Sequence, residues 1–186
     1  LMGLMIPAVI LGLIVSLAII FKKNWAPFLT PVYAIVEGLI LGFISAMAEA
    51  SFPGIVFQAV SLTMGTLFAL LFAYKSGLIP VTQNFKLGIV AATGAIAVVY
   101  LLSFVFSLFG MPFTFLHDSS LLSIGISVVV VIVAALNLVL DFDFIENGAK
   151  AGNLPKYMEW YAAFGLLVTL VWLYMEILRL LMKLQS

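Results

Sequence analysis

Six long apolar stretches follow one another along this chain of 186 residues. A helix needs about 20 mostly apolar residues to cross the hydrocarbon core of a bilayer. The connections between the stretches are short and rich in Pro, Gly, Asn and Ser, which favour turns. The expected spans are residues 1–21, 30–49, 54–74, 87–109, 120–144 and 157–183. We therefore predict one transmembrane domain that covers residues 1–186.

The composition decides the class of protein. Hydrophobic residues make up 65% of the chain and charged residues 9%, whereas a soluble domain has about 45–50% and about 25%. In lipid, only helices and closed barrels satisfy their own backbone hydrogen bonds. Barrel strands alternate in polarity, and these stretches do not. The predicted fold class is an all-α polytopic membrane protein.

Several functions are excluded by what the chain lacks. Its net charge of zero gives no electrostatic basis for binding nucleic acid. The absence of cysteine rules out disulfides and thiolate sites, and one histidine cannot build a His-rich metal site. No Ser/His or metal constellation remains, so we expect neither catalysis nor a bound cofactor. The single histidine, His117, precedes Asp118 in a connection, where an exposed loop residue is expected.

Lysines predict the orientation in the membrane. The first, third and fifth connections carry Lys22, Lys23, Lys75, Lys86, Lys150 and Lys156, and the second and fourth carry no Lys or Arg. By the positive-inside rule, the Lys-bearing connections face the cytoplasm, so we expect a multi-pass protein of the inner (plasma) membrane. The first residue then lies outside. A cytoplasmic start would need one more span upstream, which gives seven in the full protein, and the opening residues carry no basic leader.

Two basic residues of the last span disagree with this orientation. Arg179 and Lys183 come at its outer end. Either the last helix is re-entrant, or these side chains snorkel to the far interface. Snorkelling is the preferred interpretation because about 27 residues can cross the membrane fully.

Small residues recur every four positions in two spans. The first series is Ala34, Gly38, Gly42, Ala46 and Ala50, and the second is Ser61, Gly65, Ala69 and Ala73. This spacing is typical of seams where helix backbones approach closely in lipid. Ordinary packing between helices is the expected role, and a mobile interface in a transporter is the alternative.

Four acids are expected within or at the edge of the cytoplasmic half of the bilayer: Glu37, Asp141, Asp143 and Glu146. Charged groups there are costly and mark functional sites. Asn137 and Asp141 are four residues apart and share a helix face, which we expect to look into the bundle. Asp143 and Glu146 share another side nearer the surface, where a solvated helix end is the alternative.

A pair formed by Glu37 and Asp141 is geometrically feasible. Two carboxylates that share a site repel when both are ionised and can hold a proton between them. Oxygen ligands of this kind suit Ca²⁺, so Asp141 is also the expected position for that ion, although no firm metal site is predicted. For Glu37, the alternative is a structural hydrogen bond.

Two more features concern acids. Glu176 and Arg179 are three residues apart on one helix face, so a structural ion pair is expected there, with Glu176 a secondary site candidate. An intramembrane aspartyl protease needs two aspartates on facing helices. Asp141 and Asp143 lie on one helix and cannot face each other, which excludes that activity.

Two segments carry a family resemblance. Leu-Asp-Phe-Asp-Phe-Ile-Glu-Asn-Gly-Ala-Lys, residues 140–150, is followed by Lys-Tyr-Met-Glu-Trp-Tyr, residues 156–161. These resemble the last two helices of the Bax inhibitor-1/YccA family, closest to its bacterial Bax-inhibitor-1-like branch and of the transmembrane BAX inhibitor motif type. The family aspartate falls on Asp141 with Ile145 in register, and Phe142-Asp143 replaces the usual Thr-Gln. The resemblance runs along the chain without the family's first helix.

The resemblance implies a seven-helix protein that leaks Ca²⁺ under the control of two aspartates, one in each of the last two helices. Asp141 would be the first. A gapless alignment puts Leu167 at the second position, and an alignment on Leu-Tyr-x-acid puts Glu176 there. Glu176 is roughly 28 Å along the helix from Tyr157, too far to pair with Asp141. Glu37 or Asp143 is the expected substitute, and the family's interior Arg has no counterpart.

Two functions remain. The first is a pH-sensitive calcium or cation leak channel or transporter gated by buried carboxylates, with Ca²⁺ or H⁺ as the transported ion. The second is a non-conducting regulatory or adaptor protein that binds another membrane protein, such as a protease, through its small-residue seams. The lipid bilayer is a partner in both, and nucleic acid in neither.

Overall fold

The computed structural model describes residues 2–111 and 120–185, so His117 and Asp118 lie outside the described ranges. The described chain forms six long helices and no strand. They are α1 (Met2–Phe21), α2 (Ala26–Ser51), α3 (Ile55–Lys75), α4 (Gln83–Leu108), α5 (Leu121–Ala151) and α6 (Tyr157–Gln185), with a 3-10 turn, η1 (Lys23–Trp25), after α1. All six are long and apolar enough to cross a membrane. The predicted all-helical class with six spans is confirmed.

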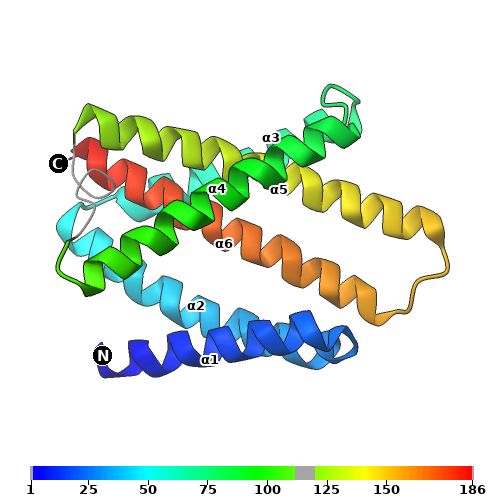
Figure 1. The fold of residues 1–186 in the computed structure, drawn as a ribbon, viewed down its shortest axis with the longest axis horizontal. Helices are drawn as coiled ribbons and strands as arrows, with labels where there is room; N and C mark the ends of the chain where they lie inside the picture. The colour runs from blue at the N-terminus through cyan, green and yellow to red at the C-terminus, as the bar shows by residue number, and fades with distance from the viewer. Residues whose placement is uncertain (1, 112–119, 186) are drawn as a thin grey trace.

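The helix α6 occupies the centre of the arrangement. It packs against α2, α3 and α5, while α1 packs against α2 and α4 packs against α5. Figure 1 shows α5, α6, α2 and α1 in that order across the molecule, with α4 crossing in front of α6 and α5. The long α5–α6 interface contributes most to this packing, so both helices can hold polar groups away from lipid.

Several helix boundaries differ from the expected spans. α2 begins at Ala26 rather than at residue 30, because Pro27 lies in its first turn, where a missing N–H costs nothing. α5 continues to Ala151 rather than stopping at residue 144, and Gly152 ends it with a φ of 70° in the left-handed region. The whole acidic stretch is therefore helical, and its side chains are placed by helical phase.

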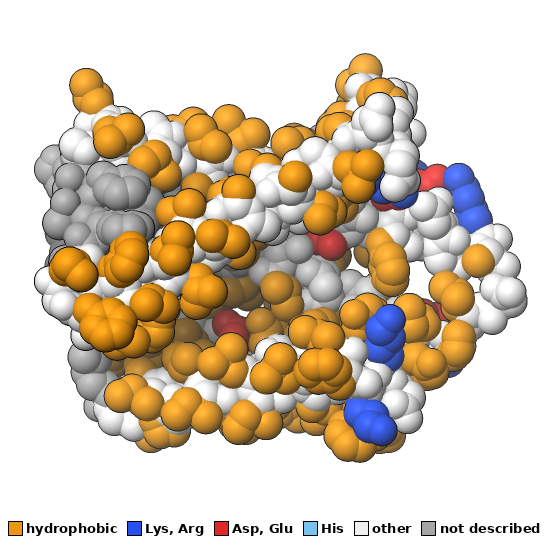
Figure 2. Space-filling model, in the orientation of Figure 1, with side chains coloured by type: hydrophobic (Ala, Val, Ile, Leu, Met, Phe, Trp, Pro, Cys, Tyr) orange, Lys and Arg blue, Asp and Glu red, His pale blue; other side chains and the backbone are white. Residues whose placement is uncertain are grey.

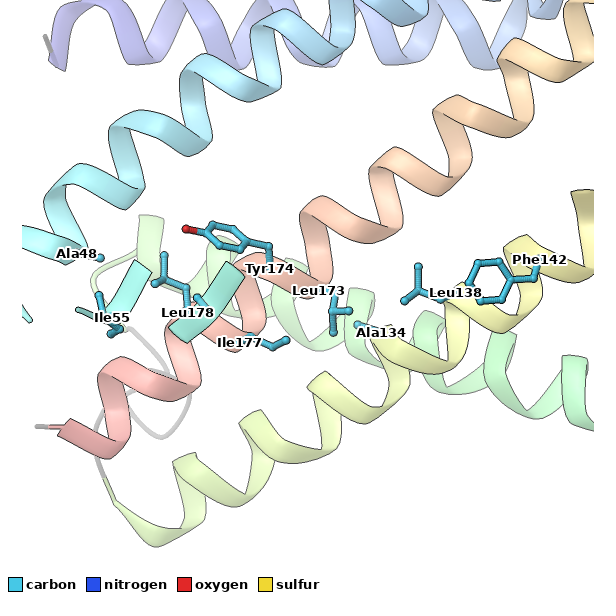
Figure 3. Packing of buried hydrophobic residues seen from close by; sticks show 10 residues of the cluster. Ala48, Ile55, Ala134, Leu138, Phe142, Leu173, Tyr174, Ile177 and Leu178 are labelled. Carbon is cyan, nitrogen blue, oxygen red and sulfur yellow. The ribbon is translucent and has the colours of Figure 1, made fainter. Parts of the chain in front are cut away.

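The main apolar core lies along α6. Buried side chains from α2, α3, α5 and α6 form it: Ala48, Ile55, Ala59, Ala134, Leu138, Phe142, Leu173, Tyr174, Ile177 and Leu178. Figure 3 shows Leu173 of α6 next to Ala134 of α5, with Leu138 and Phe142 farther along α5. A second cluster joins α1 and α2 to α6 through Val15, Ile19, Ala26, Tyr33 and Phe164. The main core fixes the faces of α5 and α6 that meet.

The outer surface is apolar and the lysines are confined to one end. Large hydrophobic side chains such as Leu4 and Phe28 are exposed, which suits contact with lipid. The α1–α2, α3–α4 and α5–α6 connections lie at the same end of the molecule, and Figure 2 shows blue side chains gathered there. We call this the Lys-rich end; it contains Lys22, Lys23, Lys75, Lys86, Lys150 and Lys156.

The small-residue seams do not pack within the described chain, contrary to expectation. Ala34, Gly38, Gly42, Ala46 and Ala50 are exposed on α2, as are Ser61, Gly65 and Ala69 on α3. A Cβ added at Gly38, Gly42 or Gly65 would meet no heavy atom within 4 Å. The spacing was a sound indication of a smooth surface, but larger side chains on other faces supply the helix contacts.

Lys183 has partners on α5 that the sequence did not predict. Its residue is 6% exposed, and its Nζ donates to Ser127 Oγ at 2.6 Å, while its snorkelling to the far interface stays a prediction. The helix α6 runs without a break from Tyr157 to Gln185, so it is not re-entrant. Seryl oxygens on the neighbouring helix solvate the ammonium group, which a single sequence cannot reveal.

Candidate functional site

Asp141 lies on the face of α5 that meets α6. It is roughly ten residues before the end of α5 at Ala151, about 15 Å from the Lys-rich end at the helical rise. Its carboxyl group lies beside the hydroxyl of Thr169 on α6. The Oδ2 atom is fully enclosed and has no hydrogen-bond partner among the described residues. A buried polar atom without a partner is rare and asks for an explanation in terms of water, an ion or function.

Thr169 explains part of this arrangement. Its residue is 8% exposed, and its Oγ1 donates to the carbonyl of Gly165 at 3.1 Å in the same helix. Because a hydroxyl has one hydrogen to donate, the bond to Gly165 competes with any bond that Thr169 gives to the Asp141 carboxyl. The carboxyl therefore faces an oxygen, rather than a cationic side chain.

Asn137 lies one turn from Asp141 and connects α5 to α4. Its Nδ2 donates to Thr93 Oγ1 and to the Val133 carbonyl, both at 2.9 Å. Both amide hydrogens are thus used, and the Oδ1 atom of this half-buried side chain remains as an acceptor. The expectation that Asn137 and Asp141 turn toward neighbouring helices agrees with these contacts.

Asp143 and Glu146 belong to the Lys-rich end. Asp143 Oδ2 pairs with Lys86 Nζ at 2.8 Å and accepts from Asn147 at 3.1 Å, while its Oδ1 accepts from the Tyr74 hydroxyl at 3.2 Å. These bonds tie α3, α4 and α5 together. Glu146 pairs with Lys150 at 2.7 Å on the same helix, and both side chains are partly exposed. Glu146 thus fits the alternative interpretation, in which it lies at a solvated end of the helix.

Glu37 faces α1. Its carboxyl lies beside the hydroxyl of Tyr33, and a Cβ added at Gly12 of α1 would be 3.3 Å from Glu37 Oε1. The Tyr33 ring in turn meets Phe164 of α6 edge-on, with 5.0 Å between the ring centroids. Glycine at position 12 therefore gives the carboxyl room between α1 and α2.

The described contacts give Glu37 and Asp141 different surroundings. Glu37 lies on the α1 side of α2, whereas Asp141 lies against α6, which packs between α5 and α2. No hydrogen bond joins the two carboxyl groups among the described residues. Nor do any three His, Cys, Asp or Glu residues of the described ranges gather as a metal site. A cation at Asp141 would therefore depend on neutral oxygens nearby.

Glu176 is the most deeply buried acid among the described residues. It is 2% exposed, and both carboxylate oxygens accept from the Tyr100 hydroxyl of α4, at 3.0 and 3.1 Å. Arg179 lies 3.7 Å from its Oε1, as the sequence spacing predicted. This group is near the end opposite the lysines, and its partners differ from those of Asp141.

Sequence reasoning missed the partner residue on α6. Leu167, the position indicated by the gapless alignment, packs against the cluster that joins α1 and α2 to α6. Thr169, two residues later, faces Asp141 instead. A hydroxyl residue in an apolar span is a known interhelical contact, so Thr169 carried a weak signal. Tyr100 and Thr93 carried even less, because no pattern joins them to α5 or α6.

Comparison with known proteins supports one assignment over the whole chain. A family model described as Bax inhibitor 1 like matches residues 1–186. No curated protein and no solved structure matches the chain.

Proposed function

Since this chain belongs to the Bax inhibitor 1 like family, we propose that it conducts cations across the membrane under the control of the Asp141 carboxyl group. Ca²⁺ is the proposed cation and pH the proposed signal. Transport, rather than catalysis, is the activity proposed. The family match and the resemblance of the acidic stretch support this proposal.

The observation that carries the proposal is the enclosed Oδ2 atom of Asp141, which has no hydrogen-bond partner in the described part of the chain. Ionising a carboxyl away from water is costly unless a charge or hydrogen bonds compensate it. The carboxyl therefore favours one of two conditions, a bound proton or a bound cation. A group that exchanges a proton for a cation can link ion passage to pH.

The neighbouring oxygens support an ion path at this depth. Thr169 and Asn137 provide neutral oxygen atoms on α6 and α5, and hard cations prefer oxygen ligands. The remaining candidate carboxylates of α5, those of Asp143 and Glu146, have lysine partners at the Lys-rich end. Asp141 is thus the acid of α5 best suited to respond to ions.

Flux in proteoliposomes tests the proposal. Purified protein is reconstituted into vesicles that contain a Ca²⁺-sensitive dye, and Ca²⁺ entry is followed from pH 5 to pH 8. We expect Asp141→Asn, which keeps the shape but cannot ionise, to abolish the pH dependence of entry. Glu146→Gln is the matched control, because Glu146 is partly exposed and paired with Lys150. Equal flux in wild type and Asp141→Asn at every pH would refute the proposal.

A second candidate function is a non-conducting adaptor that binds another membrane protein. The exposed small-residue seams of α2 and α3 favour it, because they leave smooth helix surfaces free. A hollow of about 360 Å³ between α2, α3 and α6 adjoins them and includes Gly42, Ser45 and Thr63. This candidate predicts that Gly38→Leu and Gly42→Leu abolish co-purification of a membrane partner while vesicles show no flux.

The proposed location is the inner (plasma) membrane, with the Lys-rich end in the cytoplasm. The clustering of all three Lys-bearing connections at one end supports it. Since the chain contains no cysteine, a single Ser76→Cys variant tests the orientation. Labelling of that thiol by an impermeant reagent in intact cells would reverse the proposed topology.

A further inference from the structure

One face of α6 carries a line of buried residues that begins at Thr169, beside Asp141, and runs away from the Lys-rich end. Thr169, Leu173, Glu176 and Lys183 follow a spacing of four, three and seven residues, so they share a helix face. All four are buried. Glu176 lies seven residues beyond Thr169, about 10 Å farther from the Lys-rich end. An ion that moves along this face from Asp141 therefore meets Leu173 and then Glu176.

Tyr100, Glu176 and Arg179 form a compact group at that point, which we call the clasp. The Tyr100 hydroxyl lies 3.0 and 3.1 Å from the two Glu176 oxygens, and Arg179 Nη1 lies 3.4 Å from the same hydroxyl. The Arg179 guanidinium also stacks over the Tyr100 ring, 5.5 Å from its centroid. The clasp thereby connects α4 to α6 through charged hydrogen bonds, which are stronger than neutral ones.

Lys183 extends this group by about two turns. Its Nζ donates to Ser127 Oγ at 2.6 Å and to the Ser123 carbonyl at 3.4 Å. Two positive side chains, Arg179 and Lys183, therefore follow the one carboxylate along the path. Positive side chains are a recognised barrier to cations in membrane pores.

We propose that the clasp is a gate that closes the cation path at the end opposite the Lys-rich end. This inference rests on the proposed function, because a barrier matters only in a chain that conducts. In the closed state, Leu173 fills the path beside α5, and the clasp holds α4 against α6. Opening requires Tyr100 to leave Glu176, which then offers its carboxylate to the cation.

The test measures Ca²⁺ entry into vesicles for Tyr100→Phe and Glu176→Gln. Tyr100→Phe removes the hydroxyl that both carboxylate oxygens share, while Glu176→Gln removes the charge and keeps an acceptor. We expect about tenfold faster leak from Tyr100→Phe, in line with the usual cost of losing a hydrogen bond to a charged group. Tyr174→Phe is the matched control: it removes a hydroxyl of α6 that bonds Ser45 of α2 at 2.6 Å, without an ion pair.

Thiol accessibility supplies a readout that does not depend on flux. Ser103 of α4 is 7% exposed and lies one turn from Tyr100. Because the chain has no cysteine, Ser103→Cys introduces a single reporter thiol. We expect an impermeant, charged thiol reagent to modify it slowly with the clasp intact and about tenfold faster when Tyr100→Phe is added.

The outcomes separate the two proposals. Faster modification in Tyr100→Phe, with no Ca²⁺ entry in any variant, supports the clasp and refutes conduction. Unchanged modification and unchanged entry in both clasp variants overturn the gate. An equal rise in Tyr174→Phe overturns it as well, because general loosening of α6 would then account for the effect.

Discussion

Asp141 on α5 and Glu176 on α6 are acids of neighbouring helices, but they differ in the hydrogen-bond partners of their carboxyl oxygens. Asp141 lies beside a threonine and keeps one enclosed oxygen without a described partner. Glu176 is more deeply buried, yet a tyrosine and an arginine occupy its oxygens. Burial alone therefore does not identify the responsive acid. The partner set decides whether a buried carboxylate stabilises the helix packing or remains available to a proton or a cation.

The largest change in unfolding free energy is expected from breaking the clasp. Arg179→Ala leaves the Glu176 carboxylate buried without its cation, which costs about 3 kcal/mol in unfolding free energy. Thermal unfolding in detergent measures the loss. Arg179→Lys, which keeps the charge, serves as the control and should lose much less. Equal losses in the two variants would show that packing, rather than charge, holds the clasp.

Asp141→Asn should stabilise the protein, whereas Arg179→Ala destabilises it. Removing a carboxyl whose enclosed Oδ2 atom has no partner among the described residues should raise the unfolding free energy by about 1 kcal/mol at pH 8. The gain should shrink at pH 5, because a protonated wild-type carboxyl no longer bears a buried charge. Unfolding curves at both pH values check this. A loss of stability at pH 8 would contradict the contrast between the two acids.

A smaller effect is expected at the Lys-rich end. Lys86→Met removes the partner of Asp143, but the lysine side chain is 37% exposed and Tyr74 and Asn147 still bond the carboxylate. The expected loss is about 0.5–1 kcal/mol, and added salt should reduce it further. Unfolding at low and high ionic strength measures both. A salt-independent loss would place this ion pair in a drier setting than its exposure indicates.

The smallest effect concerns Glu37. In Gly12→Ala, the added methyl would lie 3.3 Å from Glu37 Oε1 and 3.5 Å from Val36 Cγ1. A flexible carboxyl can yield a few tenths of an ångström, so we expect a change below about 0.5 kcal/mol. Gly38→Ala is the matched control, because its Cβ would meet nothing within 4 Å. A loss of several kcal/mol at position 12 alone would show that Glu37 is rigidly held.

The candidate site was partly accessible to sequence reasoning. Helical phase separated Asp141 from Asp143 and Glu146, and the i, i+3 spacing joined Glu176 to Arg179, as the structure has them. The partner of Asp141 could not be predicted from the sequence. Thr169 faces Asp141 because of how α6 is oriented about its own axis, which the packing of the helices decides. The Ser127 partner of Lys183 and the exposure of the small-residue seams were not accessible for the same reason, since spacing gives a face but not the neighbour of that face.

Six helices in a membrane could be predicted from the residues alone, because hydrophobic length and backbone hydrogen bonding in lipid permit few alternatives. The family could be predicted from the resemblance of residues 140–150 and 156–161. Tertiary structure alone decided which acid has partners. In lipid, apolar helix faces are nearly equivalent in free energy, so the packing of α4, α5 and α6 depends on shape and on a few polar contacts. That packing gives Glu176 its tyrosine and leaves Asp141 facing a threonine.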